Sequence, residues 1–157
     1  MEHTILWPTE LSKSSLQALP HVLSLADKYS STVVVLYVAP DLYAMFPAYG
    51  NYPSDDYIEK FQEWEAEKAK KSLQEICSQQ LNVCRNVDFR VVRGDPAHEI
   101  LKAAQGQGVD MIVMSSRGQS YDTVGRVGSG FGSVAKKVAE ESPVPVVLVG
   151  PESSKEE

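Results

Sequence analysis

The sequence predicts an α/β fold in which a single doubly wound domain holds a five-stranded parallel sheet with helices on both faces. Short runs of Val, Ile and Leu alternate along the chain with longer segments of helical periodicity. The short runs are apolar at consecutive positions, which is typical of parallel strands covered on both faces. The length of 157 residues matches one ordinary domain.

The five apolar runs are the predicted strands, at residues 4–7, 32–38, 87–92, 110–115 and 144–149. Consecutive parallel strands need a crossover connection, which is usually a helix. The four segments between the runs are therefore expected to be helical.

The first two crossovers are predicted to be helices at residues 12–30 and 54–80. In the first, Pro20 indicates a kink or a displaced start. In the second, acidic residues stand in the first turns and lysines follow, so that each charge suits the helix dipole. Its sheet-facing side chains are expected to be Ile58, Phe61, Leu73 and Ile76. We interpret Tyr57 and Trp64 as core or rim packing rather than as ligand contacts.

The last two crossovers have clearer boundaries. Asp95 is a predicted N-cap for a helix that begins with Pro96 and ends near residues 105–108. The final helix, at residues 134–141, separates an apolar face from a charged one. Its apolar face consists of Val134, Ala135, Val138 and Ala139.

Composition argues against several kinds of partner. The formal net charge is −6 and no basic stripe is present, so nucleic acid is not expected as a partner. The apolar runs fall far short of the roughly 20 residues that span a bilayer, so no membrane span is expected. The N-terminal segment MEHTILWPTE lacks the basic region and long apolar core of a secretory signal. We therefore expect a cytoplasmic protein.

The cysteines and histidines form no recognisable metal or redox motif. Cys77 and Cys84 have six residues between them, which fits neither a zinc site nor a CxxC pair. We interpret them as buried or idle thiols. The histidines are scattered at His3, His21 and His98. No metal site and no catalytic residue are predicted, because neither a Ser-His-Asp arrangement nor a closely spaced acid pair stands out.

A glycine-rich segment follows the fourth predicted strand. Residues 115–133 contain five glycines and five serines and lead into the final helix. Successive backbone N–H groups at a helix start form an anion site, for which phosphate is the natural occupant. Neither a P-loop nor a dinucleotide fingerprint is present. On spacing alone, glycines that only provide flexibility remain an alternative.

A second long loop, at residues 39–54, is rich in aromatic residues, proline and glycine. Loops of this length are often functional. A binding or interface element and a packed surface loop are both compatible with its composition.

The chain resembles the universal stress protein family over nearly its whole length. The resemblance rests on the segments ILWPTELSKSSLQAL, VVVLYVAP, VVRGDPAHEIL, DMIVMSSRG and GSVAKKVAEESPVPVVLV. It implies one domain at residues 1–150, with a long loop at 40–53, a glycine-rich loop at 116–131 and a polar tail at 151–157. We expect the strand order 3-2-1-4-5.

In the ATP-binding branch of this family the glycine-rich loop has the pattern G-x2-G-x9-G-[S/T]. Gly118 corresponds to the second glycine, and Ser115 stands in the place of the first. The final pair is Gly128-Ser129, after nine intervening residues, or Gly132-Ser133, after thirteen. Because only Gly132-Ser133 directly precedes the family's following helix, we interpret the four extra residues as an insertion.

The resemblance places a nucleotide at the ends of the first, second and fourth strands and at the start of the last helix. The residues implied to contact it are Pro8, Thr9, Glu10, Val38, Met114, Ser115, Ser116, Arg117, Gly118, Gly132, Ser133 and Val134. Glu10 stands where the family usually has an aspartate. Arg117 and Arg126 are either additional phosphate contacts or solvated loop side chains.

The resemblance implies a cytoplasmic stress-response protein that binds ATP or AMP, with or without Mg²⁺, and signals to an unidentified protein partner. It also implies a homodimer formed through the apolar edge strand, residues Val144 to Val149. Two alternatives remain open. One is a nucleotide-free dimeric scaffold, which Ser115 favours, and the other is a slow ATPase.

Overall fold

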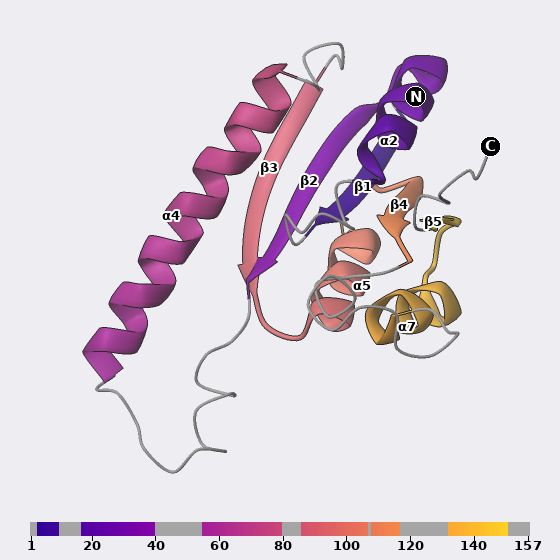
Figure 1. The fold of residues 1–157 in the computed structure, drawn as a ribbon. Helices are drawn as coiled ribbons and strands as arrows, with labels where there is room; N and C mark the ends of the chain where they lie inside the picture. The colour runs from indigo at the N-terminus through magenta and orange to yellow at the C-terminus, as the bar shows by residue number, and fades with distance from the viewer. Residues whose placement is uncertain are drawn as a thin grey trace, which may run out of the picture.

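The computed structural model describes residues 3–9, 17–39, 55–79, 86–106, 108–116 and 132–150 (Figure 1). The strands are β1 (Thr4–Thr9), β2 (Thr32–Ala39), β3 (Asn86–Arg93), β4 (Met111–Ser115) and β5 (Val146–Val149). The helices are α2 (Leu19–Tyr29), α4 (Asp55–Gln79), α5 (Pro96–Gly106) and α7 (Ser133–Glu141).

The strands form one parallel sheet in the order β3-β2-β1-β4-β5, which confirms the predicted topology. The central strand β1 separates β2 and β3 on one side from β4 and β5 on the other. Its register with β4 consists of Ile5 opposite Met111 and Leu6 opposite Ile112. Both strands continue three residues beyond this register, to Thr9 and Ser115. The direction in which strands are added to the sheet reverses between β1 and β4. At this point the register leaves the last three residues of each strand without a ladder partner in the other.

Helices cover both faces of the sheet, as predicted, and each face has its own hydrophobic cluster. Alternate strand residues such as Trp7, Val35 and Val113 pack with α2 and with Ala69 of α4. The intervening residues, such as Leu36 and Ile112, pack with α5 and α7. This division follows from the two-residue period of a strand.

Local sequence signals explain two of the helix starts. Helix α2 begins at Leu19 with Pro20 in its first turn, so the displaced start is correct, and residues 12–16 lie outside the described part of the chain. The predicted N-cap of α5 is confirmed, because the backbone N–H of His98 donates to Asp95 Oδ2 at 3.0 Å.

Helix α4 corrects part of the sequence prediction. Ile58 is buried, as expected, but the Phe61 side chain is 41% exposed instead of facing the sheet. Gln62 takes the buried position, where its Oε1 accepts a hydrogen bond from Arg93 Nη1 at 3.1 Å. This hydrogen bond offsets part of the cost of burying the polar Gln62 side chain. The side chains of Leu73 and Ile76 lie outside the described residues.

Candidate functional site

The predicted site residues that the structure describes lie at the carboxyl edge of the sheet and at the start of α7. Thr9 is buried at the end of β1, Val38 is buried near the end of β2, and Ser115 is buried at the end of β4. In parallel α/β sheets, ligands bind at the carboxyl ends of the strands, where the strand order reverses. The structure therefore brings segments that are far apart in the sequence to the edge where this class of fold binds ligands.

Three of these residues belong to one hydrophobic cluster at this edge of the sheet. Val38 and Met114 are both 6% exposed and belong to the cluster on the α5 and α7 face of the sheet, and Val134 of α7 packs against the same cluster. Pro8 is buried one residue before the end of β1.

A backbone junction at Ser116 fixes the start of α7 beside the end of β4. The Ser116 N–H donates to the Val149 carbonyl at 2.9 Å, and the Ser116 carbonyl accepts from the Gly132 N–H at 2.8 Å. The two hydrogen bonds tie β5, β4 and α7 together at one point. The sequence analysis included Ser116 among the site residues but not Val149, whose carbonyl accepts the Ser116 N–H. Val149 lies on β5, the parallel neighbour of β4, so no motif near Ser116 in the sequence could indicate it.

The N-terminus of α7 is the polar part of the site. Its N-cap is Gly132, which offers no side-chain oxygen, and the first intrahelical bond runs from Lys136 N–H to the Gly132 carbonyl. The N–H groups of the first helical turn have no intrahelical acceptor and carry the positive end of the helix dipole. An anion beside Ser133 and Val134 would meet these donors, whereas the Gly132 N–H is already engaged by Ser116.

The backbone conformation of Gly132 does not itself require glycine. Its φ of −56° and ψ of 148° are open to any residue. The backbone would therefore allow a side chain at residue 132. A glycine here would still allow a ligand to approach the backbone more closely than a residue with a Cβ would.

Part of the predicted site falls outside the described residues. Glu10, Arg117 and Gly118 belong to this group, together with the alternative pair Gly128-Ser129 and with Arg126. Their roles remain predictions.

The histidine His3 has a polar and an aromatic neighbour within the fold. His3 Nδ1 lies 2.7 Å from Ser31 Oγ, and the His3 ring stacks on Tyr29 at a centroid distance of 4.8 Å. Among the described residues, no group of three or more His, Cys, Asp or Glu side chains could hold a metal ion. Within the same residues, none of the helices has both the length and the apolar composition of a membrane span.

Two proteins with similar sequences are both described as universal stress proteins. A protein from Thermus aquaticus, described as a universal stress protein in the QAH/OAS sulfhydrylase 3′ region, is 37% identical over 100 residues, covering 63% of this chain and 68% of that protein. Universal stress protein MJ0577 of Methanocaldococcus jannaschii is 27% identical over 160 residues, covering 95% of both chains.

Solved structures share the fold. A structure of MJ0577 superposes with a TM-score of 0.80, at 27% identity, over 98% of this chain and 99% of the other. A universal stress protein bound to cAMP gives a TM-score of 0.58 at 18% identity, covering 95% of this chain and 97% of the other.

An Arabidopsis thaliana family member with AMP bound gives a TM-score of 0.62 at 14% identity, covering 98% of this chain and 94% of the other. The model of the family described as "Universal stress protein family" matches residues 1–150. This chain belongs to the universal stress protein family.

Proposed function

We propose that this protein binds an adenine nucleotide, ATP or AMP, at the carboxyl edge of its sheet. The observation that carries the proposal is the Ser116 junction, which holds the N-terminus of α7 against the end of β4. Two members of the family with the same fold are described with AMP or cAMP bound, which supports the choice of an adenine nucleotide.

The arrangement of the site suggests how the ligand would lie. The phosphates would meet the first-turn N–H groups of α7 at Ser133 and Val134, where the helix dipole favours negative charge. The base would lie beside the hydrophobic cluster that contains Val38 and Met114. With ATP, Mg²⁺ would bind mainly through the phosphate oxygens, as is usual for this ion.

We further propose that the protein acts as a cytoplasmic homodimer in a stress response and passes its nucleotide occupancy to a protein partner. The dimer contact would be Val144 to Val149, which contains β5 at the end of the sheet. All four side chains of β5 are only partly buried within the single chain, and all are apolar. An apolar edge strand of this kind can pair with another strand.

The nucleotide proposal is tested by mass spectrometry of whatever nucleotide is released from protein purified without added ligand. ATP or AMP in near-stoichiometric amount is the expected result. A second measurement is thermal unfolding with added nucleotide. A ligand at about a hundred times its dissociation constant adds roughly 2.7 kcal/mol, which should raise the melting midpoint by several degrees.

A nucleotide-free dimeric scaffold is the second candidate. Ser115 favours it, because this residue stands where the ATP-binding branch has the first motif glycine, and it is buried at the end of β4. Unchanged melting with millimolar ATP, ADP and AMP in the presence of Mg²⁺ would support the scaffold and contradict nucleotide binding. Slow ATP hydrolysis would instead be revealed by steady phosphate release during the same incubations.

A further inference from the structure

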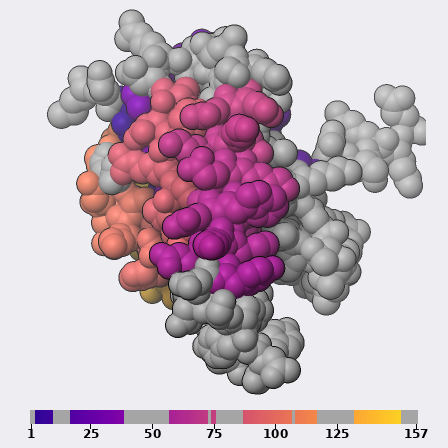
Figure 2. Space-filling view, turned by 90° about the vertical axis from the view of Figure 1, so that its left-hand side faces the viewer, coloured from indigo at the N-terminus to yellow at the C-terminus, as the bar shows by residue number. Residues whose placement is uncertain are grey.

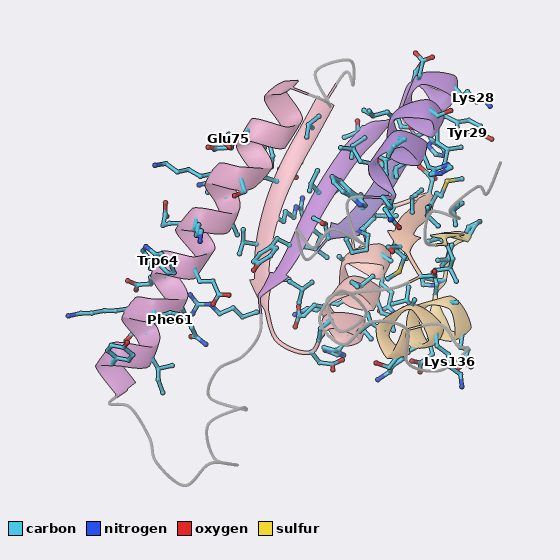
Figure 3. The ribbon with its side chains drawn as sticks, in the orientation of Figure 1. Lys28, Tyr29, Phe61, Trp64, Glu75 and Lys136 are labelled. Carbon is cyan, nitrogen blue, oxygen red and sulfur yellow. The ribbon has the colours of Figure 1, made fainter. Side chains whose placement is uncertain are left out.

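An aromatic stripe runs along the outer side of α4. It consists of Tyr57, Phe61, Trp64 and Lys68, whose spacing of four, three and four residues places them on one line of a helix. Three of the four exposed large hydrophobic side chains among the described residues belong to it: Tyr57 at 62%, Phe61 at 41% and Trp64 at 57%. Figure 2 shows α4 at the surface on this side of the molecule, and Figure 3 shows Phe61 and Trp64 on it.

Three members of the stripe, Phe61, Trp64 and Lys68, are in contact with one another rather than isolated. The Phe61 and Trp64 rings are 5.8 Å apart between centroids, and Lys68 Nζ lies 5.2 Å from the Trp64 ring centroid. A groove of about 300 Å³ runs beside it, between the stripe and Tyr37 of β2. Exposed apolar patches of this kind mark interaction sites more often than scattered surface residues do.

We propose that the stripe binds the same stripe of a second copy of this chain, with the two α4 helices antiparallel. The spacing is a palindrome, so a twofold axis between residues 62 and 63 makes the surface self-complementary. Phe61 of one helix then lies beside Trp64 of the second copy. Tyr57 lies beside the second copy's Lys68, which keeps an aromatic face next to each ammonium group.

The charges along α4 favour the antiparallel direction. Residues 55–65 contain five acidic residues and one lysine, whereas residues 66–79 contain three lysines and two glutamates. Antiparallel helices bring the acidic half of one copy to the basic half of the other, and parallel helices would bring the two acidic halves together. Lys60 and Glu67 are both exposed and flank the stripe on its solvent side, where each would face the opposite charge of the second copy.

This contact is independent of nucleotide binding and lies away from the proposed β5 contact. Helix α4 packs beside β3 at one end of the sheet, and β5 is at the other end (Figure 1). A chain that carries both surfaces can assemble beyond a dimer. Because a single helix-to-helix contact is small, we expect weak association, in the range of about 10 to 100 micromolar.

Sedimentation velocity of the purified full chain over a concentration series tests the proposal. Trp64→Glu should weaken the association by at least about tenfold, because it places a charge in the centre of the contact. Gln74→Glu is the matched control, since it adds the same charge to an exposed position of α4 ten residues beyond Trp64. In the antiparallel arrangement this position lies beyond the first turn of the second copy's α4, which begins at Asp55. The control should change the association constant less than about twofold.

A charge exchange distinguishes a second copy from any other partner. Lys60→Glu alone and Glu67→Lys alone should each weaken self-association severalfold, and the double variant should restore it, because the exchange recreates both opposite-charge pairs only between identical chains. The same series in the Val147→Lys variant separates this contact from the β5 contact. Equal sedimentation of the wild-type chain and Trp64→Glu at every concentration would overturn the proposal, as would a double variant no better than the single ones.

Discussion

The two halves of the sheet on either side of β1 are built on different scales. On one side, β2 and β3 have eight residues each and the helix between them, α4, has 25. On the other side, β4 has five residues, β5 has four and α7 has nine. The β2 and β3 pair is in register at eight positions, and the β4 and β5 pair at four.

The two halves differ in the extent of strand pairing and in what they present at the carboxyl edge of the sheet. The long half supplies an extended ladder and a broad buried surface, whereas the short half ends where the Ser116 junction presents the start of α7. The outer strands differ in the same way. Strand β3 carries the ion pair of Arg90 with Asp88, at 3.0 Å, and charged side chains on an edge discourage further pairing. Strand β5 carries only apolar side chains.

The largest expected difference between the halves is in folding stability. Leu36 of β2 is 1% exposed, and Leu148 of β5 is only partly buried against the same cluster. Leu36→Ala should therefore lower the free energy of unfolding by about 2 to 5 kcal/mol, and Leu148→Ala by less than half as much. Urea unfolding at low protein concentration measures both. Equal losses would mean that the short half contributes as much to stability as the long half.

The edge strands provide the second prediction. Val147→Lys places a charge in the middle of β5, and burying an unpaired charge at a contact is strongly unfavourable. The proposed β5 dimer should weaken by at least about a hundredfold. Analytical ultracentrifugation measures the change, with circular dichroism to confirm folding.

The opposite edge is the control for that experiment. Asp88→Lys on β3 also introduces a lysine but should leave the β5 contact intact. A wild-type chain that is already monomeric at micromolar concentration would contradict the β5 dimer.

Much of the fold follows from patterns that are local in the sequence. Continuous apolar runs identified all five strands, and Asp95 with Pro96 located the start of α5. The strand ends were less accurate: β1 continues two residues beyond the predicted run, to Thr9, and β5 begins at Val146 instead of residue 144. Ladder pairing with neighbouring strands decides such ends, and those neighbours are distant in the sequence.

The errors on α4 have a different cause. Helical periodicity allows both Phe61 and Gln62 to follow Ile58 on the inner side, and hydrophobicity alone favours Phe61. In the structure Gln62 is buried and accepts a hydrogen bond from Arg93, 31 residues away, while Phe61 lies outside with the aromatic stripe. Helical periodicity alone cannot show such a contact. In the same way, the sequence indicated an anion site at the start of α7, but only the tertiary structure shows that Ser116 engages the Gly132 N–H.

The third prediction concerns the short half alone. Gly132→Val should weaken nucleotide binding at least about tenfold in calorimetry, because bulk at the start of α7 would crowd the phosphates. The backbone conformation at this residue admits valine, so the fold should persist. Gly128→Val should weaken binding only modestly, by about two- to threefold. The reverse order of effects would show that the family's nine-residue spacing, rather than the helix start, locates the phosphates.

The smallest expected effect lies on the edge of the long half. Arg90 donates two hydrogen bonds to Asp88 Oδ2, from Nε at 3.1 Å and from Nη2 at 3.0 Å, but the two side chains are 36% and 51% exposed. Water and salt screen such a pair, so Arg90→Ala should change the free energy of unfolding by less than about 1 kcal/mol. Urea unfolding at low and high salt measures the change, which should shrink as salt is added. A loss comparable to that of Leu36→Ala, and insensitive to salt, would contradict this prediction. It would mean that the Arg90 side chain stabilises the long half by packing. The charge of Arg90 would then serve mainly to keep other strands from pairing with β3.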